Sequence, residues 1–256
     1  LILDFCSTFY QEKVEKKTLY STFQKWKTIK PTTMELPYEI KNGYRLFDWR
    51  HTCAYITQQG KIQYGQKFQL NREDWPIIRK LIIYHVRDEE LAQKEGLDLS
   101  KGLLLIGPIG CGKTSMMHLF QLLAYRMMRY RVLPSRTIAF EFQEEGYNVI
   151  HRYGRKLYPI CFDDLGLEQN IKHYGNECNT MAEILLHRYE LFTTEGVITH
   201  ATSNLNSTEL ENIYGNRVRS RLREMFNLVS FPETSHDKRK WTNEEYKDKN
   251  EGICLV

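Results

Sequence analysis

One eight-residue segment, GPIGCGKT at Gly107–Thr114, constrains this chain more than any other part of its sequence. The apolar run KGLLLI before it predicts a buried strand, and TSMMHLFQLLAYRM after it predicts a helix. The three glycines allow positive φ, so that successive backbone N–H groups can turn inward around an anion. The start of the helix adds its dipole to the same place. The segment therefore predicts a strand–loop–helix unit that binds phosphate.

The spacing G-x-x-x-x-G-K-T also assigns roles within this loop. Lys113 is expected to reach the β- and γ-phosphates of a nucleotide, and Thr114 to offer its hydroxyl to Mg²⁺. The residues expected to bind the nucleotide are Gly107, Pro108, Ile109, Gly110, Cys111, Gly112, Lys113, Thr114 and Ser115. The alternative is a chance match in a flexible glycine loop, but the flanking strand and helix favour the phosphate site.

Apolar runs and helical patterns alternate along most of the chain. Strands are expected at residues 103–106, 137–142, 160–163, 197–202 and 227–231. Helices are expected at residues 75–95, 113–130, 144–153, 179–193 and 215–225. This order predicts an α/β fold of the P-loop NTPase class, a parallel sheet with helices on both faces. Because about 25 residues follow the last strand, no C-terminal helical lid domain is expected.

Two adjacent acids, Asp163 and Asp164, end the apolar strand about 50 residues after the glycine loop. That position places them at the carboxyl edge of the sheet, where α/β proteins bind ligands. Asp163 is expected to hold Mg²⁺ through water, and Asp164 to polarise or orient the attacking water. Glu168 is a weaker acidic candidate. The alternative is that Asp-Asp-Leu-Gly only marks a turn after the strand.

The run VITHATSN ends in Asn204, whose amide can donate and accept hydrogen bonds without titrating. We expect Asn204 to hold the attacking water or to sense the γ-phosphate. The alternative is that Asn204 caps the helix that follows, since Asn is a favoured N-cap residue.

Arg217 and Arg221 lie four residues apart and share one face of a predicted helix. Stacked like charges are unfavourable, so an anion is expected to compensate them. A guanidinium group offered to the nucleotide of a neighbouring subunit would stabilise charge in the transition state. Pairing with Glu209, Glu211 or Glu224 is the alternative.

Together these segments resemble the AAA+ ATPases of the DnaC/DnaI helicase-loader and IstB branch. The resemblance covers residues 101–231 and rests on GPIGCGKT, ICFDDLGLE, THATSNLN and YGNRVRSRL. It implies that Gly112, Lys113 and Thr114 bind the nucleotide and that Asp163 and Asp164 are the Mg²⁺ and water pair. The Asp-Asp-Leu-Gly form and the expected lack of a lid are both similar to this branch.

The resemblance also implies roles for side chains beyond the loop. Asn204 looks like the family's first sensor, and Arg221 like its arginine finger, with Arg217 beside it. Arg239 is the nearest match to the second sensor arginine, although the preceding FPETS departs from the family pattern.

The resemblance implies an ATP-hydrolysing, Mg²⁺-dependent helicase loader in DNA replication, with a replicative helicase as partner. It would act as a homo-oligomer, because a finger in trans requires a neighbour. An IstB-like regulator of a transposase is the alternative within the same branch. A P-loop kinase of a small substrate and a nucleotide-switched adaptor are alternatives from other classes. Asn204 and the arginine helix argue against the kinase.

Residues 1–70 differ from the ATPase region predicted at residues 71–256, and they match no family pattern. Lysines and aromatic residues are mixed there in a pattern that suits a helix with one apolar face: Phe9, Tyr10, Lys13, Lys16, Lys17, Tyr20, Phe23, Lys25, Trp26, Lys27 and Lys30. Such a helix either packs on the main domain or binds a partner or single-stranded DNA. The net charge of +4 permits an anionic partner without requiring one.

Six cysteines without CxxC spacing favour reduced thiols in a cytoplasm. The sequence contains neither a bilayer-spanning run nor a leader pattern, so no membrane partner is expected.

Overall fold

The computed structural model describes residues 36–168, 171–173 and 176–240, and the chain divides into two compact units, residues 1–58 and 59–256. In the first unit, β1 (Tyr38–Lys41) pairs antiparallel with β2 (Tyr44–Phe47). Asn42 and Gly43 between them both have positive φ, as a tight hairpin turn requires. Helix α2 (Trp49–Tyr64) runs on into the second unit.

The N-terminal helix expected among the lysines and aromatic residues falls at residues 9–30, outside the described part of the chain. The functional division at residue 70 stays a prediction. Among the helices of the described residues, none combines the length with the apolar character that a bilayer crossing requires.

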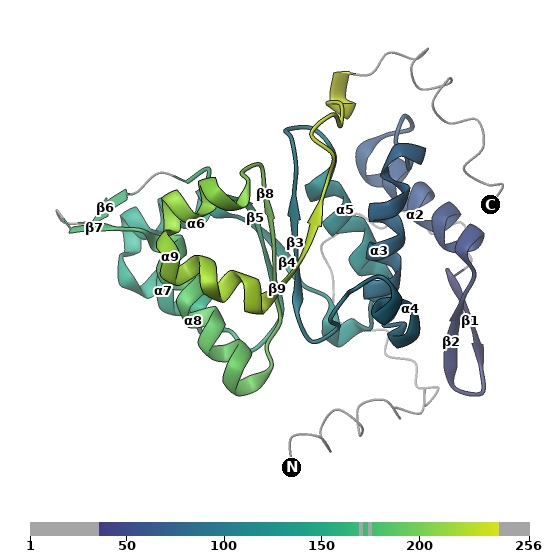
Figure 1. Ribbon diagram of the computed structural model, residues 1–256, viewed down its shortest axis with the longest axis horizontal. Helices are drawn as coiled ribbons and strands as arrows, with labels where there is room; N and C mark the ends of the chain where they lie inside the picture. Colours follow the sequence, from purple (N-terminus) through teal and green to yellow (C-terminus); the bar gives the residue numbers. More distant parts are fainter. Residues whose placement is uncertain (1–35, 169–170, 174–175, 241–256) are drawn as a thin grey trace, which may run out of the picture. The chain divides into compact units, whose positions relative to one another are not determined.

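The second unit is built on a parallel sheet of five strands in the order β4-β5-β8-β3-β9 (Figure 1). Its strands are β3 (Gly102–Ile106), β4 (Arg131–Pro134), β5 (Ile160–Leu165), β8 (Thr199–Ser203) and β9 (Phe226–Ser230). All four pairings are parallel, so the carboxyl ends of the strands meet at one edge. Strand β8 lies between β3, which leads into the glycine loop, and β5, which carries the two acids.

Helices cover both faces of this sheet, as predicted. Figure 1 shows α6 to α9 on one side and α3 to α5 on the other. The helices are α3 (Trp75–Val86), α4 (Glu89–Lys94), α5 (Lys113–Phe120), α6 (Ser135–Glu145), α7 (Tyr147–Gly154), α8 (Thr180–Glu195) and α9 (Ser207–Met225). A short hairpin of β6 (Ile171–His173) and β7 (Asn176–Cys178) precedes α8. The α/β fold predicted from the alternating pattern is confirmed.

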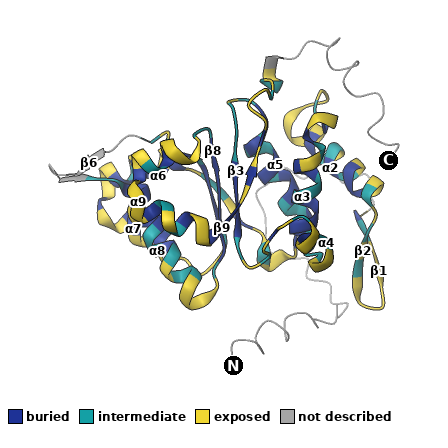
Figure 2. Cartoon of the chain, in the orientation of Figure 1, coloured by how far each residue is buried: buried dark blue, intermediate teal, exposed yellow. Residues whose placement is uncertain are grey.

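The core lies between the sheet and the helices that cover it (Figure 2). Phe162 on β5 and Ala201 on β8 are fully buried, and they pack with Phe142 of α6 and Ile184 of α8. Burying a side chain as large as that of Phe162 or Ile184 stabilises the fold by roughly 1.5–3 kcal/mol. Strand β3 is a continuous apolar run because both of its faces are covered. Strand β8 is just as buried but polar, with Thr199, His200, Thr202 and Ser203 all inside.

One fully buried side chain on this side of the sheet is charged. The Arg188 guanidinium of α8 donates to the carbonyls of Lys156, Tyr158 and Ile198 and, at 2.8 Å, to the Thr199 hydroxyl. Burial lowers the pKa of Arg188 to about 10. Its hydrogen bonds tie the chain before β5 to the chain that enters β8, so both strands start at fixed positions.

The strand expected at residues 137–142 is wrong, because this segment belongs to α6. Ile138, Ala139 and Phe142 are buried whereas Phe140 is exposed, which is the spacing of one helix face. The second strand of the domain is instead β4, whose Pro134 is tolerated because β4 lies at the edge of the sheet. The helix expected at residues 144–153 corresponds to α7, which begins after Gly146.

The single helix expected at residues 75–95 is two helices. Arg87 adopts a left-handed conformation, with φ of 64°, and ends α3. Asp88 then caps α4 by accepting a hydrogen bond from the backbone N–H of Leu91 at 2.9 Å. Because Asp is a favoured N-cap residue, a second helix begins at once.

The helix expected at residues 113–130 is shorter than predicted. Helix α5 ends at Phe120, and the turns η2 (Gln121–Leu123) and η3 (Arg126–Met128) follow it. Tyr130 is held near α5 because its hydroxyl lies 3.0 Å from the Met117 carbonyl and its N–H donates to the Gln121 side chain. These bonds draw the chain back toward the sheet and override the helical pattern.

The remaining predicted elements are confirmed, with shifted ends. The strands expected at residues 103–106, 160–163, 197–202 and 227–231 correspond to β3, β5, β8 and β9. The helices expected at residues 179–193 and 215–225 correspond to α8 and to the second part of α9. Helix α9 begins at Ser207 but is kinked at Gly215, which has a non-helical backbone with φ of 80°.

Candidate functional site

The glycine loop lies where the sequence placed it, between β3 and α5. Gly112 is the N-cap of α5 with φ of 104°, so the loop enters the helix through a left-handed residue. Gly110 has φ of 82°, and a Cβ atom added there would lie 2.0 Å from the Asp237 carboxylate. At both positions only glycine fits, and the resulting loop presents its backbone to the start of a helix, as an anion site requires.

Lys113 is folded into this loop, with 4% of the residue exposed. Its ammonium group donates to the carbonyls of Gly107 at 2.8 Å and Pro108 at 2.9 Å, and lies 3.7 Å from the Cys111 sulfur. Burial lowers the pKa of Lys113, and the nearby carboxylates of Asp164 and Asp163 oppose that shift. A cation is thus held at the centre of the predicted phosphate site.

The other loop residues are arranged around this cation. Ile109 is exposed at the tip of the loop, whereas Cys111 is fully buried. The Ser115 hydroxyl donates to the Gly112 carbonyl at 2.9 Å, inside the first turn of α5. The loop is therefore fixed from within at its helical end.

Asp163 connects three elements of the site. One of its carboxylate oxygens accepts hydrogen bonds from the hydroxyls of Thr114 on α5, at 2.9 Å, and of Thr202 on β8, at 2.6 Å. Asp163 and Thr114, the two groups predicted to hold Mg²⁺, are therefore together. Both offer oxygen, the atom that Mg²⁺ prefers, and nucleotide sites commonly combine one or two such groups with phosphate oxygens and water.

Asp164 sits at an irregularity of the sheet. Phe162 pairs with Ala201 and Leu165 with Ser203, so β5 has one more residue than β8 between these pairs. Asp164 has φ of 57°, a conformation that costs a residue other than glycine about 1 kcal/mol or more. Bulges of this kind turn side chains to new directions beside active sites. Here two consecutive carboxylates, those of Asp163 and Asp164, both favour the charged form of Lys113 and so oppose the lowering of its pKa by burial.

Asn204 holds the second carboxylate. Its amide donates to Asp164 at 3.2 Å, while the backbone N–H of Asp164 donates to the Thr202 hydroxyl at 2.9 Å. Burial and then the Asp163 charge raise the pKa of Asp164, while Lys113, Asn204 and Arg239 oppose that shift. A carboxylate with a raised pKa is a stronger proton acceptor.

The alternative role for Asn204, capping the next helix, belongs to Asn206. The Asn206 side chain accepts from the backbone of Thr208 and Glu209, and the Glu209 side chain accepts from the backbone N–H of Asn206 in return. This is a complete capping box. Asn204 is therefore left to contact Asp164.

Glu168, the weaker acidic candidate, stabilises the loop after β5. Its two carboxylate oxygens accept from the Gly166 backbone N–H, at 2.9 Å, and from the Tyr214 hydroxyl. These bonds hold the turn that follows the acids.

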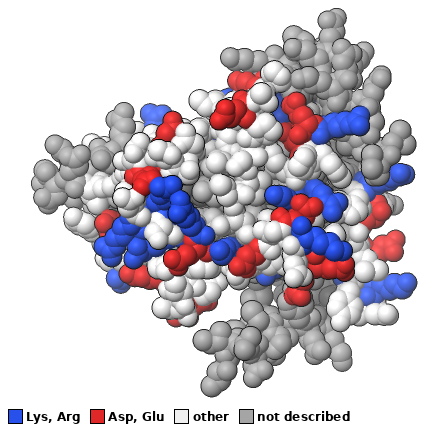
Figure 3. Space-filling view, in the orientation of Figure 1, with Lys and Arg blue, Asp and Glu red and all other residues white. Residues whose placement is uncertain are grey.

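Arg217 and Arg221 lie on α9, where Figure 3 shows basic side chains gathered among acidic ones. The Arg221 guanidinium lies 4.9 Å from the centre of the Tyr189 ring on α8 and donates to the Arg217 carbonyl at 2.9 Å. Among the acids weighed as partners for this helix, Glu211 pairs with Arg219. The structure places Arg221 against α8 rather than at the glycine loop of its own chain.

The segment after β9 comes back to the glycine loop. Arg239 donates to the Asp237 carboxylate at 3.0 Å, and its charge opposes the rise in the pKa of Asp164 that burial causes. Lys238, which sequence reasoning missed, lies closer to the loop, because its ammonium group donates to the Cys111 carbonyl at 2.5 Å and to the Asp74 carboxylate. Neither contact leaves a local signal in the sequence, because Lys238 lies 164 positions after Asp74 and 127 positions after Cys111.

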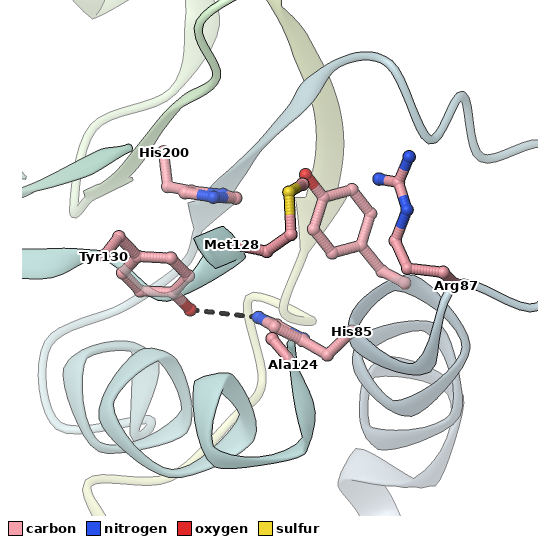
Figure 4. Close-up of a pocket in the computed structure, with 7 residues that line it drawn as sticks. His85, Arg87, Ala124, Met128, Tyr130 and His200 are labelled. Carbon is pink, nitrogen blue, oxygen red and sulfur yellow. Dashed lines mark hydrogen bonds between the residues drawn. The ribbon is translucent and has the colours of Figure 1, made fainter. Parts of the chain in front are cut away.

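A small cavity elsewhere in the unit is not a nucleotide site. It is lined by residues that include His85, Arg87, Met128, Tyr130 and His200 (Figure 4). Its volume of about 10 Å³ is just enough to admit one water molecule. The Nδ1–H of His85 donates to the Leu81 carbonyl at 2.7 Å, and Nε2 of the same ring lies 3.0 Å from the Tyr130 hydroxyl. The contact with Tyr130 joins α3 to the chain that enters β4.

The cysteines within the described part of the chain are free thiols, consistent with the predicted absence of a disulfide framework: Cys53, Cys111, Cys161 and Cys178.

Comparisons with known proteins find similarity only among solved structures. No protein-family model and no curated protein sequence matches the chain. A primosome component from Streptococcus pyogenes serotype M3 is similar with a TM-score of 0.46 and 17% identity, over 65% of this chain and 83% of that one. The DnaC helicase loader is similar with a TM-score of 0.41 and 17% identity, over 75% and 95%. DnaI is similar with a TM-score of 0.42 and 21% identity, over 53% and 72%.

This chain has the fold of a P-loop NTPase. The parallel sheet, the glycine loop between β3 and α5, and the acids at the end of β5 establish that fold.

The buried His85 predicts a stability that depends on pH. Burial lowers the pKa of His85 to about 4, from an ordinary value of 6.5. Its stabilising contribution is therefore complete above pH 6.5 and is lost as the pH falls from 6.5 through 4. Unfolding by urea at pH 8 and pH 5 should show a loss of about 2 kcal/mol from this residue at the lower pH. His85→Gln should reduce the difference between the two pH values by about that amount, and an unchanged difference would contradict this account.

Proposed function

We propose that this chain binds and hydrolyses ATP with Mg²⁺, as a helicase loader of the AAA+ class acting in DNA replication. One observation carries the ATPase proposal: side chains from the glycine loop, from β5 and from the end of β8 meet at one edge of the sheet. They are Lys113, Asp163, Asp164 and Asn204, and hydrogen bonds and charge interactions connect them. Phosphate binding alone would require only the loop.

Each group has a defined task in the proposed reaction. The loop N–H groups and Lys113 bind the phosphates, and Thr114 and Asp163 hold Mg²⁺. When bound, Mg²⁺ neutralises part of the phosphate charge. Asp164 orients the attacking water and accepts its proton, while the Asn204 amide fixes the position of that carboxylate.

The arginine helix supports an oligomeric site. Arg221 lies against Tyr189 on α8, and Arg217 and Arg223 are exposed on the same helix. We propose that Arg221 reaches the nucleotide of a neighbouring copy, with Arg217 beside it, and that Arg239 contacts the nucleotide of its own chain. Guanidinium groups suit this task because they bind two phosphate oxygens at once.

The loader role rests on the motif resemblance, and its partner would be a replicative helicase. Affinity capture with the full chain, followed by mass spectrometry, tests this partner. Recovery of a replicative helicase supports the loader, and recovery of a transposase supports the IstB-like regulator instead. Direct binding of single-stranded DNA is a separate proposal, tested by fluorescence anisotropy with a labelled oligonucleotide at several salt concentrations.

Replacing Asp164 should separate binding from hydrolysis. Asp164→Asn keeps the shape of the side chain but removes the proton acceptor, so hydrolysis should fall about a hundredfold or more. ATP affinity should change by no more than a few-fold, because Asp164 does not belong to the loop. Phosphate release and equilibrium binding measure the two effects.

Glu168→Gln is the matched control, because Glu168 lies just after β5 and its carboxylate accepts from Gly166 and Tyr214 instead of facing the loop. It should hydrolyse ATP at close to the original rate. Full hydrolysis by Asp164→Asn would show that another group activates the water.

Mixing variants tests whether the finger acts between subunits. Arg221→Ala and Lys113→Ala should each hydrolyse ATP poorly when alone. In an equal mixture, about a quarter of the interfaces combine an intact loop with an intact neighbouring arginine, so about a quarter of the original rate should return. Arg219→Ala is the control, because Arg219 pairs with Glu211 on its own helix. If both variants fold and associate but no activity returns, the site is not shared.

A further inference from the structure

The backbone after β9 is bound directly to the glycine loop. The N–H of Phe231 donates to the Ile106 carbonyl at 2.8 Å, at the end of β3, and the N–H of Lys238 donates to the Gly110 carbonyl at 3.1 Å. The Asp237 carboxylate fills the space beside Gly110 that a Cβ atom would need. Residues 231–238 therefore lie along the outside of the loop.

The side chain of Lys238 joins this contact to a distant part of the chain. Its ammonium group donates to the Cys111 carbonyl at 2.5 Å and to the carboxylate of Asp74, and lies 5.4 Å from the centre of the Phe231 ring. Asp74 ends the turn η1 (Arg72–Asp74), immediately before α3. One cation thus connects that turn to the phosphate loop.

The ion pair is shielded from solvent. The side chains of Lys238 and Asp74 are 16% and 1% exposed, respectively. Asn71 donates to Asp74 at 3.4 Å, but the second carboxylate oxygen of Asp74 is buried without a hydrogen bond to any described residue. A carboxylate buried this deeply is costly unless it is paired with a cation. The pairing therefore holds Lys238 strongly in place.

Lys238 donates hydrogen bonds to two consecutive carbonyls of the loop. Its backbone N–H donates to the Gly110 carbonyl, and its ammonium group donates to the Cys111 carbonyl. In a trans peptide, the N–H of the next residue points away from the carbonyl. Fixing these carbonyls on the outside therefore directs the N–H groups of Cys111 and Gly112 toward the inside of the loop. The Cys111 N–H indeed points to the Pro108 carbonyl, at 3.4 Å, which also accepts from Lys113.

We propose that Asp74 and Lys238 form a brace for the phosphate loop, acting as positioning residues that keep its N–H groups turned toward the nucleotide phosphates. The brace rests on the proposed ATP binding. It acts through the loop backbone, without contact between Asp74 and the nucleotide. It also makes the loop sensitive to the position of the turn before α3.

Two substitutions remove the brace in different ways. Lys238→Met keeps the packing on Phe231 but loses the cation, and Asp74→Asn keeps the shape of the carboxylate but loses its charge. Each should weaken binding of a ribose-labelled fluorescent ATP analogue by about tenfold or more, the loss expected for one charged hydrogen bond. The KM for ATP should rise by a similar factor, while kcat at saturating ATP should stay within about threefold.

The double variant distinguishes a brace from two independent losses. Because both substitutions remove the same interaction, the double variant should bind ATP about as weakly as either single variant. Lys94→Met is the matched control, because Lys94 pairs with Glu90 on the exposed surface of α4, and it should bind normally. Thermal unfolding of each variant checks that it folds.

Hydrogen exchange separates failure of the brace from failure of the proposed function. Without nucleotide, the amides of Cys111 and Gly112 should exchange about tenfold or more faster in Lys238→Met and in Asp74→Asn than in the original chain. Unchanged exchange, or unchanged ATP affinity in both folded variants, would overturn the brace. If the original chain binds no ATP while the amides exchange faster in the variants, the proposed function fails and the loop-ordering role of the brace stands.

Discussion

The site depends on the hydroxyl of Thr202, which donates to the Asp163 carboxylate at 2.6 Å and accepts from the backbone N–H of Asp164 at 2.9 Å. Through these two bonds β8 holds both acids of β5 at the point where the strand bulges. The same Asp163 oxygen also accepts from Thr114, the first residue after Lys113. The strand order, with β8 between β3 and β5, makes this arrangement possible. A small polar residue at the end of β8 therefore connects the loop, the acids and the sheet.

Local chemistry in the sequence was sufficient to predict most of the candidate site. The glycine loop has a fixed spacing, and parallel strands bring Asp163, Asp164 and Asn204 to one edge without any knowledge of side-chain contacts. What escaped prediction depends on tertiary contacts. The bulge at Asp164 appears only when β5 pairs with β8, and the contacts of Lys238 join residues far apart in the chain. The strand predicted at residues 137–142 was wrong because the spacing of Ile138 and Phe142 suits both a strand and a helix over a short run.

The surroundings of the loop give it two kinds of support. From inside, Lys113 contacts the carbonyls of Gly107 and Pro108, and from outside Lys238 contacts those of Gly110 and Cys111. The inner cation can exchange its carbonyl partners for phosphate oxygens, because these are stronger acceptors. The outer cation is tied to a buried carboxylate and keeps its place. In the proposed ATP site, this difference would let Lys113 respond to nucleotide while Lys238 preserves the shape of the loop.

The central claim is that the loop around Lys113 binds ATP as part of a hydrolytic site. Isothermal titration of ATP with Mg²⁺ into the purified full chain tests it most directly. The account predicts one ATP per chain, with affinity reduced about tenfold or more in folded Lys113→Ala. No binding to the original chain, or equal affinity in the variant, would contradict it.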